Sequence, residues 1–387
     1  MTVRLGDWAK VLDHDVRANP AFRLRRLDAL PDAYRNALRD AGLNLAGVFG
    51  VLVADRDSGL ADKVVDEAAA QLFSDLHRPA PLPSDAVGRF AELVLDGVLE
   101  LDSVRGFVSG PLAYEAVVEP QELSAELDRL GQLSHAAVNY AARLRLGEVG
   151  PTTGRLYFFN RVPISPRWAR AFPGRGAVQD LLSGPALTRD WVAGFSVSQE
   201  PEWLWFTRRD DPGRVDLMAY KLYVSPAVED LADTLPVLVE ALTRAGAKRF
   251  KVGPDAPGLL RPDKIVVHME HVHELELIAA TLETALDGVR PHGVPFTANL
   301  AGDGLLSWGG DPHPDAGPMG EGFESWRVSI CRRLAEYLTA AGAAPLTRLT
   351  PADYALARLA LDGVDERTFA PAGLVAPARP DALVASR

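Results

Sequence analysis

The sequence is poor in several features that would point to common functions. Its single cysteine, Cys331, excludes an intramolecular disulfide and a cysteine-based structural zinc site. No apolar run approaches the roughly 18 residues of a membrane helix, and the first residues lack the apolar stretch of a signal peptide. The net charge of -11 argues against general binding to nucleic acid or to anionic membranes. We therefore expect a cytoplasmic protein that binds neither.

Familiar ligand-binding and catalytic motifs are also missing. There is no Walker A motif, no G-x-G-x-x-G and no G-x-S-x-G. The stretch HMEHVHELE brings together His268, Glu270, His271, His273 and Glu274, but it bridges a predicted strand and helix and has no H-E-x-x-H spacing. Cys331 lies on an apolar helical stripe and is predicted to be a buried structural thiol. The sequence therefore predicts no metal and no cofactor.

The length of 387 residues implies about two or three domains. Residues 1–118 form the predicted N-terminal domain: 1–45 are expected to be helical and mixed, and 46–110 alternate strands, helices and a closing hairpin, as in a small winged-helix element. Residues 119–200, with a long amphipathic helix over 120–147 and many aromatic residues and arginines, are predicted to connect this domain to a C-terminal domain at 201–368. A flexible tail is predicted at 369–387.

The C-terminal domain has the clearest pattern. Strands are predicted at 216–225, 248–253, 264–269 and 294–299, with helices at 227–245 and 273–287. This β-α-β-β-α-β order is a split βαβ unit, a two-layer sandwich with helices on one face of the sheet. The predicted fold class is α+β, and a last helix is expected over about 324–341.

Side chains alternate along a strand, so titratable groups gather on the face away from the helices. The pairs Lys221 with Tyr223 and Lys264 with His268 each share a strand face, and Lys251 lies on a third strand. Arg327 is in phase with the buried stripe of the last helix, near its N-terminus, where anions are favoured. These residues either line one site or are solvated charges at a sheet edge.

A cluster of this kind suits one reaction, the β-elimination of phosphate. It needs a base at the Cα proton, positive charge on the leaving phosphate and a nearby proton donor. A lysine acts as the base only when it is uncharged, which burial beside other cations promotes. Lys221 among Lys251, Lys264 and Arg327 meets that description.

Three short motifs carry a family resemblance. The stretches YKLYVSP (220–226), FKVGP (250–254) and DKIVVHM (263–269) resemble the phosphoserine/phosphothreonine lyase domain of class III and IV lanthipeptide synthetases, itself similar to bacterial phosphothreonine lyase effectors. The segments GVPFTANLAGDGLLSW and ESWRVSICRRLAEYL are similar to the Hop-type effector-like lyase components of class V pathways. The resemblance covers about 215–345.

The resemblance implies roles for the titratable residues. Lys221 matches the family's base, and Lys251 and Lys264 match phosphate-binding positions, with Arg261 and Arg327 as further phosphate ligands. Tyr223 stands where the family has its acid histidine. A phenol with an ordinary pKa near 10 is a weaker acid than imidazolium, and His268 is the alternative donor.

The implied function is that of a lyase component acting on a phosphorylated ribosomal precursor peptide to give dehydroalanine or dehydrobutyrine. Its partners are then the precursor, a separate Ser/Thr kinase and further biosynthetic subunits, and residues 46–110 resemble elements that bind leader peptides at a sheet edge. The alternative is a degenerate lyase-like protein that binds the precursor and scaffolds the kinase or promotes cyclisation.

Overall fold

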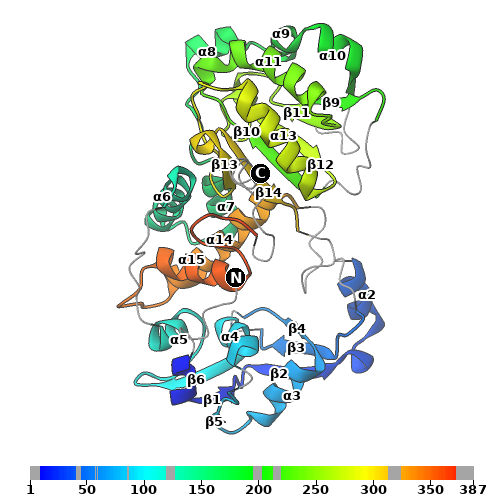
Figure 1. The fold of residues 1–387 in the computed structure, drawn as a ribbon. Helices are drawn as coiled ribbons and strands as arrows, with labels where there is room; N and C mark the ends of the chain where they lie inside the picture. The colour runs from blue at the N-terminus through cyan, green and yellow to red at the C-terminus, as the bar shows by residue number, and fades with distance from the viewer. Residues whose placement is uncertain are drawn as a thin grey trace, which may run out of the picture.

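The computed structural model describes residues 9–40, 45–56, 58, 60–84, 87–118, 127–194, 203–211, 219–312 and 324–371. Figure 1 shows two sheet-containing regions at opposite ends of the molecule, with a group of helices between them. The N-terminal region is drawn in blue and cyan, and the larger sheet with its helices occupies the other end. The predicted α+β class is confirmed.

The N-terminal region contains two small antiparallel sheets. One has the order β2 (Phe22–Arg26), β3 (Gly50–Ala54), β4 (Lys63–Val65). The other has the order β5 (Ala80–Pro81), β1 (Asp15–Ala18), β6 (Leu99–Ser103), β7 (Gly106–Val108). The helices are η1 (Ala9–Asp13), η2 (Leu27–Ala29), α2 (Asp32–Asp40), α3 (Glu67–Asp75), α4 (Val87–Leu95) and α5 (Gly110–Val117).

The segment 1–45, expected to be helical and mixed, contains the two strands β1 and β2, whose positions were not predicted. Val16 and Ala18 are buried and alternate with more exposed neighbours, and Val16 pairs with Leu101 across the sheet. Pairing with strands far along the chain therefore overrides the local helical pattern. The predicted closing hairpin is present as β6–β7, and it extends the sheet of β1 rather than that of β3 and β4.

The C-terminal region is built on one seven-stranded sheet in which every neighbouring pair is antiparallel. Its order is β13 (Ala298–Ala301), β14 (Leu306–Gly310), β10 (Tyr220–Val224), β12 (Ile265–Met269), β11 (Arg249–Val252), β9 (Leu204–Arg208), β8 (Trp191–Gly194). Strand β12 lies between β10 and β11, which are parallel to each other. The split βαβ unit is thus present, and the hairpin β13–β14 and the strands β8–β9 widen it on either side.

One face of this sheet carries the main core. Leu222, Phe250 and Val267 pack there with buried residues of α11 (Leu231–Arg244) and α13 (Val272–Ala285), which lie across the sheet in Figure 1. Further short helices in this region are α8 (Pro166–Ala171), α9 (Arg175–Leu182), α10 (Pro185–Asp190), η4 (Val228–Asp230), α12 (Ala256–Leu259) and η5 (Gly302–Gly304).

The other face is partly covered by the central helices. Helix α14 (Trp326–Ala343) packs with α6 (Arg129–Leu144), α7 (Val149–Tyr157) and α15 (Pro351–Leu361) around a core that includes Phe296 of the sheet region. Parts of several predicted elements fall outside the described residues. They include 1–8 and 41–44 of the N-terminal segment, 120–126 of the long helix, 216–218 of the first strand of the C-terminal domain and 372–387 of the tail. Among the residues described, no helix is both long and apolar enough to cross a membrane.

Candidate functional site

Strand pairing brings two of the predicted site residues, Lys221 and His268, into one row with Arg249 on the face away from the main core. Lys221 of β10 lies opposite His268 of β12, and His268 lies opposite Arg249 of β11. By the alternation of side chains, Tyr223 and Lys251 lie on the same face of their strands. The centre of this face is therefore cationic.

Lys221 is nearly buried and is held by a carboxylate. Its Nζ lies 2.5 Å from Asp311 Oδ2, and Asp311 Oδ1 accepts a hydrogen bond of 2.8 Å from the backbone N–H of Trp326 at the start of α14. Gly309 lies opposite Lys221 on β14, and a Cβ there would collide with the Trp326 indole. Asp311 thus links Lys221 to the N-terminus of α14, and the glycine makes room for the tryptophan.

His268 lies at the centre of the row and is only 8% exposed. Its ring centroid is 5.0 Å from that of Trp205, and its Nε2 has no hydrogen-bond partner among the described residues. Burial lowers the pKa of His268 well below its usual value, and the charges of Lys251, Lys221 and Arg249 lower it further. The imidazole is therefore neutral at pH 7 in this structure.

Aromatic rings flank the row on the side of β9. Lys251 Nζ lies 4.4 Å from the ring centroid of Trp203 and 4.8 Å from that of Trp205. Both distances are in the range of cation–π attraction, which stabilises an ammonium group at this place. Lys251 is partly exposed, so the row is reached by solvent here.

Tyr223 is 3% exposed and packs in a small cluster with Trp203, Trp205, Val266 and Val294. Burial raises the pKa of its phenol well above the usual value, and the negative charge of Asp311 adds to the increase. A phenol in this environment is a poorer proton donor than one in water.

Lys264 is fully buried, and its amine makes two contacts at the end of the sheet. It donates to Pro226 O at 3.1 Å and lies 2.7 Å from His292 Nδ1. Burial lowers the pKa of Lys264 to about 7, and burial together with Lys264 lowers the pKa of His292 to about 3. These contacts are structural: they tie β12 to the segment that follows β10 and to the one that precedes β13.

Arg261 and Arg327 form a second cluster around Asp263. Arg261 binds this carboxylate through two hydrogen bonds of 2.9 Å, and Arg327 Nη1 lies 2.7 Å from Asp263 Oδ2. Tyr157 OH also donates to Asp263, and Arg327 donates to two backbone carbonyls, those of Pro295 and Tyr157. Both guanidinium groups are thus directed at the same carboxylate.

The protonation state of Asp263 follows from these contacts. Burial opposes its ionisation, but the charges of Arg327 and Arg261 outweigh burial and hold the pKa of this carboxyl below its usual range. Asp263 is therefore an anion at neutral pH and compensates the two arginines.

Three residues at this face were not predicted, and two of them had a usable signal. Arg249 precedes Lys251 by two positions, so strand alternation puts it on the same face. Trp205 lies with Trp203 in an aromatic stretch that precedes the first predicted strand of the C-terminal domain, 216–225. Asp311 gave no signal, because the strand that presents it, β14, was not predicted.

The His- and Glu-rich stretch has a structural role. Glu274 accepts hydrogen bonds from the backbone N–H groups of Glu270 and His271 as part of a capping box at the start of α13, and it pairs with Lys248. Within the described part of the chain, no group of His, Cys, Asp and Glu side chains has the geometry of a metal site. Cys331 is fully buried as predicted, and burial raises the pKa of its thiol to about 12.

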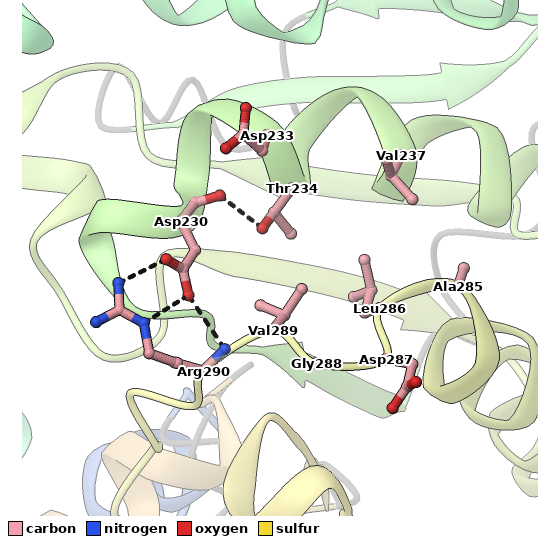
Figure 2. Close-up of a pocket in the computed structure, with 10 residues that line it drawn as sticks. All are labelled: Asp230, Asp233, Thr234, Val237, Ala285, Leu286, Asp287, Gly288, Val289 and Arg290. Carbon is pink, nitrogen blue, oxygen red and sulfur yellow. Dashed lines mark hydrogen bonds and ion pairs between the residues drawn. The ribbon is translucent and has the colours of Figure 1, made fainter.

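A surface pocket lies away from this face, between the start of α11 and the turn that follows α13 (Figure 2). It is lined by Asp230, Asp233, Thr234, Val237 and residues 285–290, and an ion pair of Asp230 with Arg290 closes one side of it. None of the predicted site residues lines this pocket. The cationic row is therefore the candidate site.

No protein-family model and no curated protein matches the chain. Among solved structures, it is similar to an effector protein from Pseudomonas syringae pv. tomato strain DC3000, with 13% identity over 64% of this chain and 100% of that chain and a TM-score of 0.40. An effector from Pseudomonas syringae pv. syringae strain 61 gives 12% identity, 63% and 99% coverage and a TM-score of 0.39.

Phosphothreonine lyases are also among the similar structures. The type III effector and phosphothreonine lyase OspF from Shigella flexneri matches at 12% identity over 44% of this chain and 86% of that chain, with a TM-score of 0.27. Such low TM-scores do not define a shared fold, so the chemistry has to be inferred from the site itself.

Proposed function

We propose that the protein is a carbon–oxygen lyase that eliminates phosphate from phosphoserine or phosphothreonine in a peptide, leaving dehydroalanine or dehydrobutyrine. The observation that carries this proposal is the direct pairing of Lys221 with His268 on the non-core face, with Lys251 on the next strand. The face thus combines a candidate base, a candidate acid and a cation, which are the three parts that the reaction needs. The motifs around these residues support the same chemistry.

The order of the groups across the sheet suggests their roles. The uncharged amine of Lys221 takes the Cα proton, and the electron pair of the C–H bond forms the Cα=Cβ double bond. The Cβ–O bond breaks, its electrons leave with the phosphate, and His268 protonates the departing oxygen. Lys251 lies on the far side of His268 from Lys221 and stabilises the charge of the phosphate.

Substrate binding has to change the protonation of His268. A phosphate dianion beside the ring raises the pKa of this histidine, because an opposite charge within a few ångström favours the imidazolium. His268 then becomes the acid of the reaction. Tyr223 is a weaker candidate, since burial raises the pKa of its phenol.

Lys221 has a related constraint. Asp311 stabilises its ammonium form, whereas a base has to be uncharged. We infer that the Lys221–Asp311 ion pair weakens before proton transfer, and that a newly charged His268 next to Lys221 promotes this step.

The remaining predicted phosphate ligands have a different proposed role. Arg261 and Arg327 hold Asp263, and Lys264 holds the ends of two segments, so we assign all three a positioning role rather than direct contact with substrate. Replacing them should reduce stability together with activity.

The proposed context is the biosynthesis of a lanthipeptide-like ribosomal peptide in the cytoplasm. The substrate would be a precursor peptide that a separate Ser/Thr kinase has phosphorylated, because the chain has no recognisable kinase motif. Other biosynthetic subunits are candidate partners. The edge strands of the β2–β3–β4 sheet are the proposed place for an extended leader segment to add.

A second candidate function is binding without catalysis. It is favoured by Tyr223, which occupies the position of the family's acid histidine and is buried, and by Asp311, which neutralises Lys221. In this case the protein would hold the precursor, scaffold the kinase or promote cyclisation.

Mass spectrometry of a synthetic phosphothreonine peptide incubated with the full chain distinguishes the two functions. A lyase removes one phosphoric acid per site, and Lys221→Ala and His268→Asn abolish the loss. The matched control is Lys248→Ala, because Lys248 pairs with Glu270 and Glu274 outside the row. Binding of the peptide by a folded protein with no loss of phosphate would exclude the lyase.

A further inference from the structure

Three buried nitrogen atoms in one region lack hydrogen-bond partners among the described residues. They are Trp205 Nε1, Arg249 Nε and His268 Nε2. Trp205 is 9% exposed and His268 is 8% exposed, so neither side chain can turn its nitrogen freely to solvent. Most buried polar groups in proteins are hydrogen-bonded, and each exception requires a physical explanation.

The three side chains are neighbours on the same sheet face. Arg249 lies opposite His268 across β11 and β12. The ring of Trp205 lies 5.0 Å from that of His268, and the guanidinium of Arg249 lies 5.9 Å from the Trp205 ring centroid. The side chains that carry the unpartnered nitrogens therefore form one cluster.

The chemistry of the cluster specifies what it can bind. The indole and guanidinium N–H groups can only donate hydrogen bonds, so they require an acceptor. Arg249 and Lys251 add positive charge from the same strand, and burial lowers the pKa of Arg249, which means that its surroundings leave its charge poorly compensated. An anion with several acceptor oxygens meets both needs.

We propose that Trp205 and Arg249 form the subsite for the non-bridging oxygens of a phosphate monoester, and that His268 beside them faces its ester oxygen. A phosphoryl group supplies three acceptor oxygens and nearly two negative charges. This inference rests on the proposed lyase function only in identifying the ligand as the phosphate of a peptide.

The subsite also orders the substrate along the row. Phosphate bound between β9 and β11 places the ester oxygen at His268 and the Cα proton toward Lys221. The phosphate subsite is then distinct from the Asp263 cluster, to which Arg261 and Arg327 are bound.

Titration of the full chain with inorganic phosphate, followed by calorimetry, tests the subsite without requiring catalysis. Trp205→Phe keeps an aromatic ring but removes the N–H donor, and Arg249→Lys keeps the charge but removes the Nε donor. Each variant should bind phosphate about tenfold more weakly or worse, the usual effect of losing a hydrogen bond to a charged group.

Trp308→Phe is the matched control. The Trp308 Nε1 is also buried and without a partner, but the ring belongs to the main core on the opposite face of the sheet. This variant should bind phosphate like the wild type, and thermal unfolding verifies that all three variants are folded.

The two proposals fail in different ways. Unchanged phosphate affinity in Trp205→Phe or Arg249→Lys overturns the subsite, as does the absence of phosphate binding by the wild type, even if the protein eliminates phosphate from peptides. Loss of phosphate affinity in both variants with no elimination by the wild type supports the subsite and excludes the lyase.

Discussion

The ion pair between Lys221 and Asp311 leads to the most specific prediction for the proposed mechanism. We expect Asp311→Asn to accelerate elimination, because an amide no longer stabilises the ammonium form of the base. Asparagine has nearly the same size and retains an oxygen that accepts the hydrogen bond from Trp326 N–H. The substitution therefore removes the charge and preserves the link to α14.

The size of the effect follows from the geometry of the pair. Two unit charges about 4 Å apart attract by roughly 4 kcal/mol at an effective dielectric constant of about 20. The Lys221 and Asp311 side chains are 10% and 22% exposed, so water screens part of this attraction. We take about 1–2 kcal/mol as the remaining strength of the ion pair that has to be broken before reaction, which corresponds to a rate increase of about 5- to 30-fold when it is removed.

The assay is a single-turnover measurement with saturating phosphothreonine peptide, quenched and analysed by mass spectrometry. The matched control is Asp303→Asn, because Asp303 lies in the turn between β13 and β14 and has a positive φ that asparagine tolerates. An unchanged or lower rate in folded Asp311→Asn would refute the assignment of Lys221 as the base and would leave it as a fixed cation.

Three further predictions concern neighbouring groups. Tyr223→Phe should retain most of the elimination rate in the same assay, and a loss comparable to that of His268→Asn would make Tyr223 the acid. Asp263→Asn should lower the free energy of unfolding, measured by urea denaturation, by about 3–5 kcal/mol, because Arg327 loses its buried counter-ion. The pKa of Asp263 is lowered in the folded state. The stabilisation by this carboxylate is therefore present above the unfolded pKa of about 3.9 and is lost as the pH falls through the folded pKa. Folding lowers the pKa of Lys264 from 10.5 to about 7, so between these pH values Lys264 is protonated in the unfolded state and uncharged in the folded state. The free energy of unfolding should therefore rise with pH in this range by up to about 1.4 kcal/mol per pH unit. Lys264→Met should abolish this slope.

Much of the C-terminal fold was predictable because its central strands are short runs of branched and aromatic residues with clear alternation. This pattern located β10, β11 and β12 and put Lys221 and Lys251 on the face away from the main core. The pairing order was not predictable, since it depends on contacts between distant segments. Strand β14 was missed because LSWGG ends in two glycines, which weaken the strand pattern.

The sequence was sufficient to select most residues of the candidate site, but not to predict which of them lie together in space. Seven cationic or titratable residues were selected from the sequence, yet the structure divides them between the row on the sheet face, the Asp263 cluster and the Lys264 contacts at the sheet end. Asp263 stands next to Lys264 in the motif DKIVVHM, but nothing in the sequence indicates that the distant Arg327 joins the nearby Arg261 on this carboxylate. The same limit applies to β1 and β2, whose partners decide that they are strands.

The position of β12 between β10 and β11 has a consequence for the timing of folding. The row forms only when a strand made later in the chain inserts between two earlier ones, and its Asp311 partner comes from a still later hairpin. Such non-local pairings form slowly compared with local helices. During synthesis, a chain that ends before residue 311 lacks the carboxylate that pairs with Lys221 and the helix that binds this carboxylate, so the site is completed only after Trp326 has been added.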